Sequence, residues 1–310
     1  MAELRQPRLH FVLGKGGVGK STVAAALALM FAQRGARVLG IELDAPGGLS
    51  GLLGVALPRP GAIVETPAGV SLTYFDGADA LTEYLRRKMH LGRLADTVVE
   101  HPLYQAFVQA APGVKELMAI GKVRDELVLK SHWDFVVVDA GASGHALEYL
   151  RMPAATRATF RRGRVHREAS RVHALLADPV RTAVHVVATP EEMPVLEAIE
   201  TTERLRDELG LPLGRIIVNR HAPPAPAAVA GALEVLAQMP IQDAGQRAAR
   251  EQLQSVARQR LGWLQIQTRG VAELEAATHA RALLLPLLPS ARFGMAELSA
   301  LANALAPELI

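Results

Sequence analysis

Short apolar runs alternate along the chain with longer stretches in which apolar residues recur at helical spacing. Apolar runs of about four to eight residues are typical of buried strands, and recurrence every three to four residues is typical of helices. The runs predict strands at Leu9–Leu13, Arg37–Leu43, Phe135–Val138, Ala183–Ala188, Arg215–Val218 and Ala282–Leu285. Helices are predicted at Ser21–Arg34, Pro194–Leu209 and Gly294–Leu305. This alternation predicts an α/β fold, a mostly parallel, doubly wound sheet with helices on both faces.

Two long stretches do not fit a simple repeat of strand and helix. Residues 78–130 have a helical pattern that breaks at Pro112-Gly113, and residues 151–178 form a second, polar helical stretch. Because both lie between predicted strands, we expect a single domain over residues 1–310, with these stretches forming a helical subdomain at one edge of the sheet. Residues 222–230 are rich in alanine and proline and are predicted to be a linker.

Composition narrows the chemistry that the chain can perform. It has no cysteine, which excludes disulfides, thiolate metal sites and a cysteine nucleophile. A net charge of +3 is too small to indicate nucleic-acid binding. Residues 1–10 are polar and lead directly into a strand, and the longest apolar run, Thr22–Ala32, has 11 residues, too few to span a bilayer. We expect a cytoplasmic protein without a secretory signal.

Residues 14–21 (Gly-Lys-Gly-Gly-Val-Gly-Lys-Ser) satisfy the P-loop pattern and lie between a predicted strand and a predicted helix. The glycines let backbone N–H groups turn inward around a phosphate, and the helix adds the positive end of its dipole. In this pattern Lys20 reaches the β- and γ-phosphates and Ser21 ligates Mg²⁺. The residues expected to bind ATP are Gly14, Lys15, Gly16, Gly17, Val18, Gly19, Lys20, Ser21 and Thr22, the last at the α-phosphate.

The loop carries a second lysine, Lys15, which is not needed to hold the phosphates within one subunit. The segment Lys15–Ser21 resembles the deviant Walker A loop of the MinD/ParA/ArsA superclass. The resemblance implies a dimer in which Lys15 crosses the interface to the nucleotide of the partner subunit. There it would stabilise charge on the transferring phosphoryl group, as an arginine finger does. A solvated loop lysine is the alternative interpretation.

A second segment, Asp139–Pro153, is similar to switch II of the ArsA-type ATPases, which include the arsenite-pump ATPase and the targeting factor for tail-anchored membrane proteins. The resemblance implies that Asp139 holds Mg²⁺, and Asp139 ends a buried strand at the edge where open α/β sheets bind ligands. It also implies that Ser143 and Gly144 sense the γ-phosphate and that His145 relays the movement of the switch. A packed or solvated histidine is the alternative for His145.

The resemblance assigns roles at the ends of three more strands. Asp44 aligns with the switch I aspartate that orients the attacking water, although Asp-Ala-Pro-Gly-Gly stands where the family has Asp-Pro-Ala. An exposed turn aspartate is the alternative. Asn219 aligns with an amide that reads the adenine edge, and Pro286 and Leu287 align with a loop that covers the adenine ring. The catalytic residues implied by the resemblance are Asp44, Lys15 and Lys20.

The chain also departs from the family that it resembles. Without cysteine it has neither the thiolate arsenite site of the pump nor the Cys-x-x-Cys zinc site of the tail-anchor factor. Residues 156–171 carry six arginines and one glutamate, unlike an apolar client groove. This segment predicts docking of an acidic protein partner or peripheral contact with an anionic membrane. A solvated helical face is the alternative.

We therefore expect an ATP-hydrolysing, dimeric switch of the ArsA family that couples its ATP state to an unknown protein or membrane-associated client; arsenite transport itself is not expected. A homodimer is expected, and a heterodimer with a related ATPase stays open. One alternative is a positioning ATPase of the ParA/MinD kind, which residues 302–310 disfavour because they lack the basic residues of a membrane anchor. The other alternative is a weakly hydrolysing partner subunit of a paralogous ATPase, which the altered switch I leaves open.

Overall fold

The computed structural model describes residues 7–89, 113–130, 132–141, 143–224 and 227–309. Within these residues, eight strands form one sheet in the order β3-β4-β2-β5-β1-β6-β7-β8. The strands are β1 (Leu9–Gly14), β2 (Val38–Leu43), β3 (Val64–Glu65), β4 (Val70–Phe75), β5 (Phe135–Asp139), β6 (Thr182–Ala188), β7 (Leu213–His221) and β8 (Ala282–Pro286). Neighbouring strands are parallel, except that β3 pairs antiparallel with β4. The predicted α/β fold with a mostly parallel sheet is confirmed.

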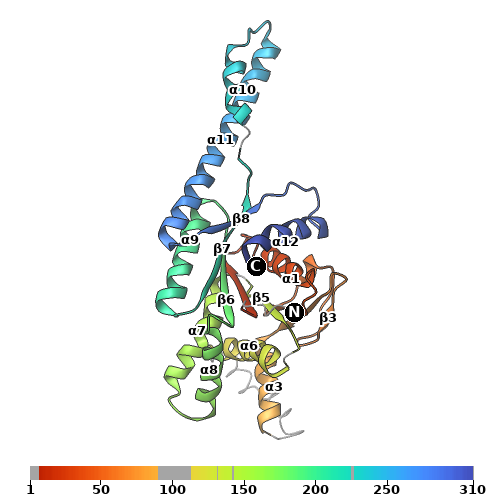
Figure 1. Ribbon diagram of the computed structural model, residues 1–310, viewed down its shortest axis with the longest axis vertical. Helices are drawn as coiled ribbons and strands as arrows, with labels where there is room; N and C mark the ends of the chain where they lie inside the picture. Colours follow the sequence, from red (N-terminus) through yellow and green to blue (C-terminus); the bar gives the residue numbers. More distant parts are fainter. Residues whose placement is uncertain (1–6, 90–112, 131, 142, 225–226, 310) are drawn as a thin grey trace, which may run out of the picture.

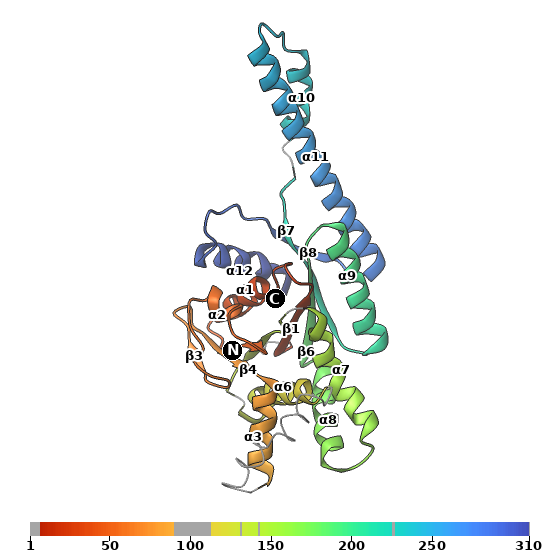
Figure 2. The ribbon, with the colours of Figure 1, turned by 180° about the vertical axis from the view of Figure 1, so that it is seen from behind.

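Helices cover both faces of this sheet (Figure 1 and Figure 2). They are α1 (Lys20–Ala32), α2 (Leu49–Leu52), α3 (Gly77–Met89), α6 (Val114–Arg124), α7 (Ser143–Thr159), α8 (Gly163–Leu176), α9 (Glu192–Glu203), α10 (Ala227–Gln238), α11 (Ala244–Thr278) and α12 (Met295–Leu309). The π-helical segments Asp125–Lys130 and Arg204–Glu208 continue α6 and α9. One hydrophobic core joins the sheet to α1, α2 and α12, and a second joins it to α6, α7, α8, α9 and α11.

Helix α1 is apolar on all its sides, and every residue from Val23 to Phe31 is buried. A helix without a polar face must be covered all round. The sheet covers one side of α1, and Leu298 and Leu301 of α12 belong to the same core on the other. This burial fixes the position of the loop before α1, residues 14–19, at the carboxyl edge of the sheet.

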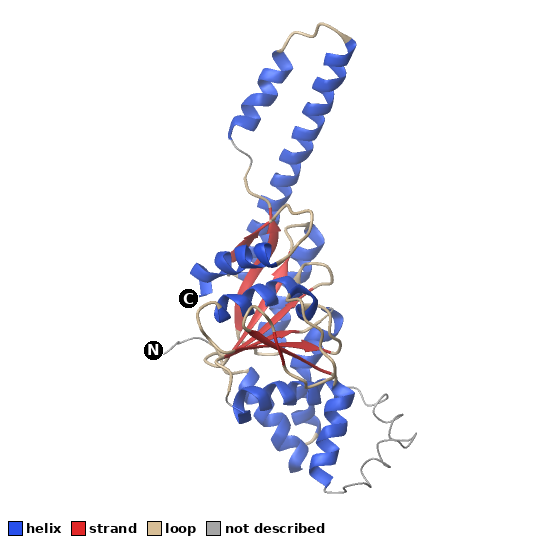
Figure 3. Cartoon of the chain, turned by 90° about the vertical axis from the view of Figure 1, so that its right-hand side faces the viewer, coloured by secondary structure: helices blue, strands red, loops and turns tan. Residues whose placement is uncertain are grey.

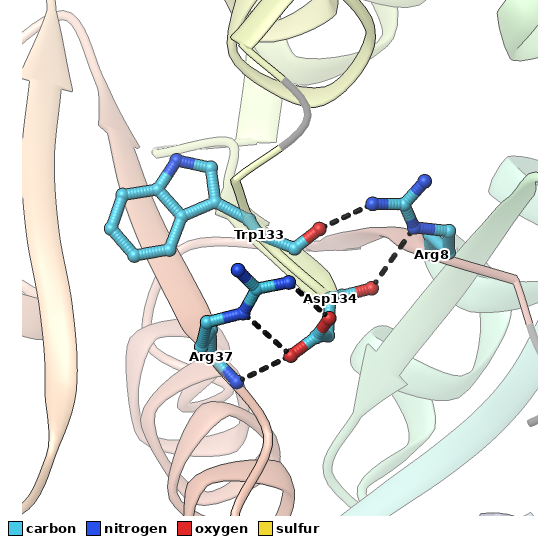
Figure 4. A network of polar contacts seen from close by, with 4 residues as sticks. All are labelled: Arg8, Arg37, Trp133 and Asp134. Atoms are coloured by element: carbon cyan, nitrogen blue, oxygen red, sulfur yellow. Dashed lines mark hydrogen bonds and ion pairs between the residues drawn. The ribbon is translucent and has the colours of Figure 1, made fainter. Parts of the chain in front are cut away.

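The amino edge of the sheet is held by a polar network around Asp134, just before β5 (Figure 4). Arg37, just before β2, donates from its Nη2 to Asp134 Oδ1 at 2.8 Å and from its Nε to Oδ2 at 3.1 Å. Arg8, just before β1, donates to the backbone carbonyls of Trp133 and Asp134. The hydrogen bonds from Arg37 lower the pKa of Asp134 to about 2. Three central strands are thus tied together at the edge opposite the P-loop.

The helical insertions leave the sheet at its carboxyl edge, because α3 follows β4, α7 follows β5 and α10 follows β7. Helices α3, α6, α7 and α8 gather at one end of the molecule (Figure 1 and Figure 3). Helices α3, α6 and α8 match the two stretches predicted to form a helical subdomain to within one residue, whereas α7 begins eight residues before the second stretch, at Ser143. Residues 90–112 are outside the described residues. The division into one domain with a helical subdomain stays a prediction.

At the other end, α10 and α11 form an antiparallel hairpin that projects beyond the sheet (Figure 1 and Figure 3). This hairpin was not predicted from the sequence. Residues 222–230 were predicted to be a linker, whereas α10 begins inside that range, at Ala227. Helix α11 begins at an N-cap, where Asp243 accepts a hydrogen bond of 2.8 Å from the backbone of Gln246. None of the helices that the structure describes is both long enough and apolar enough to cross a membrane.

Candidate nucleotide-binding site

The predicted P-loop connects β1 to α1 and lies tightly against the neighbouring strands. Gly14 has φ +147°, and a Cβ there would lie 2.2 Å from the carbonyl oxygen of Val187. Gly19 has φ +91°, and a Cβ there would lie 2.3 Å from Nδ2 of Asn219. Both positions therefore require glycine, for conformation and for space. The conformation of the loop therefore depends on β6 and β7, which supply Val187 and Asn219.

Lys20 is the first residue of α1, and only 7% of its surface is exposed. Its Nζ donates to the carbonyl of Lys15 at 2.9 Å, so the side chain folds back across the loop. Burial lowers the pKa of Lys20, and the nearby charge of Asp139 acts in the opposite direction. A buried cation pinned over a glycine-rich loop is suited to bind an anion such as a phosphate group.

Two carboxylates face each other at the carboxyl edge, because Glu42 on β2 and Asp139 on β5 are partners in the parallel register. Both are buried, with 3% and 4% of their surfaces exposed. Burial raises the pKa of Asp139, and the negative charge of Glu42 raises it further. Three groups lower this pKa in turn: the Ser21 hydroxyl, the Gly141 N–H and the charge of Lys20. Like charges opposite each other are destabilising unless cations lie beside them. Lys20 supplies one positive charge at Asp139, and the pair leaves oxygens that a further cation could use.

Oxygen atoms from neighbouring elements lie close together around this pair. An ideal Cβ built on Gly48 would lie 2.7 Å from Ser21 Oγ, 3.0 Å from Asp139 Oδ2 and 3.2 Å from Glu42 Oε1. Oxygens from three separate elements therefore converge near one point, and hard oxygen donors are the ligands that Mg²⁺ prefers. The second oxygen of Glu42, Oε2, is buried and lacks a hydrogen-bond partner within the described residues. The metal role of Ser21 and Asp139 stays a prediction, and Glu42 joins it as a residue that the sequence analysis missed.

The segment predicted to be switch I is folded around Glu42. Its Oε1 accepts the backbone N–H of Gly47 at 3.0 Å and that of Leu49 at 2.8 Å. Asp44 adopts a left-handed conformation with φ +73°, and its N–H donates to the carbonyl of Phe75 at 3.0 Å. The carboxylate of Asp44 is exposed and accepts a hydrogen bond from the hydroxyl of Tyr149 in α7. The backbone at Asp44 is thus held in a left-handed turn by its hydrogen bond to Phe75.

The other predicted nucleotide contacts lie around the P-loop. Lys15 is exposed and forms an ion pair with Glu197 of α9. Asn219 is buried and donates from its side chain to the carbonyl of Val18 at 2.9 Å, so in this structure it braces the P-loop. Pro286 lies opposite His221 in the β7–β8 register, and the N–H of Leu287 donates to the carbonyl of His221 at 2.8 Å. The predicted roles of Lys15, Asn219, Pro286 and Leu287 at the nucleotide stay predictions.

The predicted switch II residues form the start of α7. Ser143, Gly144 and His145 make its first turn, and β5 ends four residues before Ser143, at Asp139. Their side chains are outside what the structure describes, so their roles toward the γ-phosphate also stay predictions. Thr22 lies in the first turn of α1, directly after Lys20 and Ser21. The predicted site residues therefore surround one edge of the sheet.

A parallel sheet with a glycine-rich loop between its first strand and a buried helix defines a P-loop nucleotide-binding protein. A sequence profile of the family described as anion-transporting ATPase (ArsA_ATPase) matches residues 7–168, more than half of the chain. The chain therefore belongs to the ArsA family of ATPases, and the resemblance stated from its P-loop and switch II is confirmed.

Individual relatives agree with this assignment. The chain is 34% identical over 226 residues to the ATPase BagA of Mycobacterium tuberculosis, which covers 70% of this chain and 66% of BagA. It is 26% identical over 258 residues to an arsenical pump-driving ATPase of Acidiphilium multivorum, which covers 76% of this chain and 44% of that protein. It is 31% identical over 144 residues to the ATPase GET3 of Malassezia globosa, with coverages of 46% and 41%. The chain thus spans just under two thirds of BagA and less than half of the other two relatives.

Proposed function

We propose that this protein binds Mg·ATP at the P-loop and hydrolyses ATP as a dimeric switch that couples its nucleotide state to a protein or membrane-associated client. The observation that carries the proposal is the convergence of Ser21, Asp139 and Glu42 on one point beside Lys20, at the edge where the family's loop begins. Cation and anion sites side by side are what a metal-bound phosphate requires. Membership of an ATPase family supports the same reaction.

Each residue has a distinct part in the proposed reaction. Lys20 and the backbone N–H groups of the loop bind the β- and γ-phosphates. Ser21, Asp139 and Glu42 would hold Mg²⁺, which when bound neutralises charge on the phosphates. Asp44 orients the attacking water, a contribution worth about 10²–10⁴-fold. Lys15 acts across a dimer interface, so a monomer lacks the positive charge that the partner subunit supplies to the phosphates.

A second candidate is a partner subunit that binds nucleotide and hydrolyses it weakly. It is favoured by the sequence after β2, where Asp44-Ala45-Pro46-Gly47-Gly48 departs from the Asp-Pro-Ala of the predicted switch I. In this alternative a paralogous ATPase supplies the hydrolysis and this chain supplies the interface. The client, the homodimer or heterodimer and the cytoplasmic location stay predictions, as does docking through residues 156–171.

The test compares Lys20→Ala with Lys122→Ala, a control in α6 whose lysine pairs with Glu83. Thermal stability is measured with and without Mg·ATP, and phosphate release is measured on the same samples. We expect Lys20→Ala to lose both the ATP-induced stabilisation and the hydrolysis, because it removes the cation that holds the phosphates. Lys122→Ala should keep both. Unchanged stabilisation of Lys20→Ala by Mg·ATP would contradict nucleotide binding at this loop.

A further inference from the structure

One contact links the two predicted switches directly. The hydroxyl of Tyr149 donates a hydrogen bond to Oδ1 of Asp44, although 105 residues separate them in the chain. Tyr149 lies on α7, the helix that begins with the switch II residues, and only 3% of its surface is exposed. Asp44 lies at the end of β2 in switch I. The contact therefore joins a buried, fixed donor to an exposed carboxylate.

The direction of this hydrogen bond is set by its surroundings. Burial raises the pKa of Tyr149 far above its ordinary value, and the hydrogen bond to Asp44 and the negative charges of Asp44, Glu116 and Asp76 raise it further. The phenol therefore keeps its proton and donates it. Within the described part of the chain the phenol occupies Oδ1 of Asp44, which leaves Oδ2 to accept a hydrogen bond from a water. A carboxylate held at one oxygen and open at the other is suited to orient a nucleophilic water.

The position of the phenol depends on α7. Tyr149 and its neighbours Ala146 and Leu150 belong to the core that packs on the sheet, so the side chain moves with the helix. The helix begins at Ser143, six residues before Tyr149, which corresponds to a rise of about 9 Å. The Tyr149 hydroxyl therefore lies on the same continuous helix as the predicted switch II residues.

We propose that Tyr149 is a positioning residue for ATP hydrolysis, which holds the Asp44 carboxylate in place for the attacking water and ties its position to switch II. This inference rests on the proposed function, because it assigns a partner to the side chain that orients the water. A tyrosine is needed here for its hydroxyl, since a phenylalanine would fill the same volume in the core without holding Asp44.

The experiment is a double-mutant cycle on turnover with Tyr149→Phe, Asp44→Asn and the double variant. Tyr149→Phe should lower kcat about tenfold to a hundredfold, the effect expected from the loss of one hydrogen bond to a charged group. KM should stay within about twofold of wild type, and the melting temperature should fall by only a few degrees, because the core volume is kept and one hydrogen bond is lost. In the Asp44→Asn background, Tyr149→Phe should cause no further loss. The control is Tyr74→Phe on β4, which should leave kcat unchanged.

The outcomes separate this inference from the proposed function. A wild-type protein that does not hydrolyse ATP, alone or with a related ATPase, overturns the proposed function. Given an active wild type, an unchanged or increased kcat for Tyr149→Phe overturns the positioning role. So does an equal loss in the wild-type and Asp44→Asn backgrounds, because a merely structural effect would be the same in both.

Discussion

Replacing Glu42 with glutamine tests whether the buried carboxylate pair is a magnesium site. The change keeps the size of the side chain and an acceptor oxygen for the N–H groups of Gly47 and Leu49, but it removes one negative charge beside Asp139. The fold should therefore keep its stability to within about 1 kcal/mol, because the repulsion within the pair disappears while hydrogen bonds remain.

The affinity for Mg²⁺ should fall much more than the stability. Loss of a group that supports a metal site typically weakens metal binding about 10–100-fold, equivalent to about 1.4–2.8 kcal/mol. Glu42→Ala should lower both the affinity for Mg²⁺ and the stability of the fold. It leaves the buried N–H of Leu49 without its acceptor, which costs about 1–3 kcal/mol, whereas Gly47 keeps Ser50 Oγ at 3.0 Å. The two variants thus have different expected signatures.

The measurement is thermal stabilisation by a fixed concentration of ATP while the Mg²⁺ concentration is varied. We expect the midpoint for Glu42→Gln to lie about 10–100-fold above that of wild type, with the same melting temperature in the absence of ligand. The control is Glu65→Gln, since Glu65 is exposed on the edge strand β3. A Glu42→Gln variant with the wild-type Mg²⁺ midpoint would refute the reasoning and reduce Glu42 to a structural support for the loop.

Two other predictions concern Lys15 of the P-loop and a pair of buried histidines. Lys15→Ala should bind Mg·ATP but release phosphate about 10³–10⁵-fold more slowly. The control Glu197→Gln should keep its turnover, because an exposed ion pair holds Lys15 only weakly. Normal turnover of Lys15→Ala would exclude a role of this lysine in the partner subunit's site. The buried His10 and His185, whose Nδ1 and Nε2 lie 3.0 Å apart, have lowered pKa values, about 4 for His10, because burial disfavours their charged forms. Between pH 6.5 and 4 the unfolded chain therefore binds more protons than the folded chain. The free energy of unfolding should fall by about 3 kcal/mol over that window for His10 alone. Urea midpoints that do not fall from pH 7 to 4 would contradict this.

The fold was predictable where the sequence pattern reflects burial. The six predicted strands are all present because apolar runs closed by glycine or polar residues have few other uses in a core. Strand β4 was missed because Val70–Phe75 mixes buried and half-buried positions near the edge of the sheet. The α10–α11 hairpin was missed because residues 222–230, rich in alanine and proline, were interpreted as a linker, and the clearest helix signal in this region is the Asp243 N-cap.

The site was predictable where its residues are contiguous. The P-loop can be read from residues 14–21 because a phosphate is bound mainly by consecutive backbone groups. Glu42 could not be found this way, since it is a single polar residue in a buried strand. Only the register that places it opposite Asp139 gives it a role. Tyr149 resembled an ordinary core aromatic, because its contact with Asp44 spans 105 residues. Pairs brought together by the sheet are invisible to local patterns.

The glycines of the predicted switch I can be explained by these contacts. The loop lies directly over the converging oxygens, since a Cβ on Gly48 would approach Ser21, Asp139 and Glu42 within 2.7–3.2 Å. Only a residue without a side chain fits there, and Glu42 holds the loop in place through the N–H groups of Gly47 and Leu49. The two glycines and the buried glutamate are thus parts of one arrangement. A cation bound at this point would share Glu42 Oε1 with the N–H groups of Gly47 and Leu49, so we expect its binding to be coupled to the position of the loop that carries Asp44.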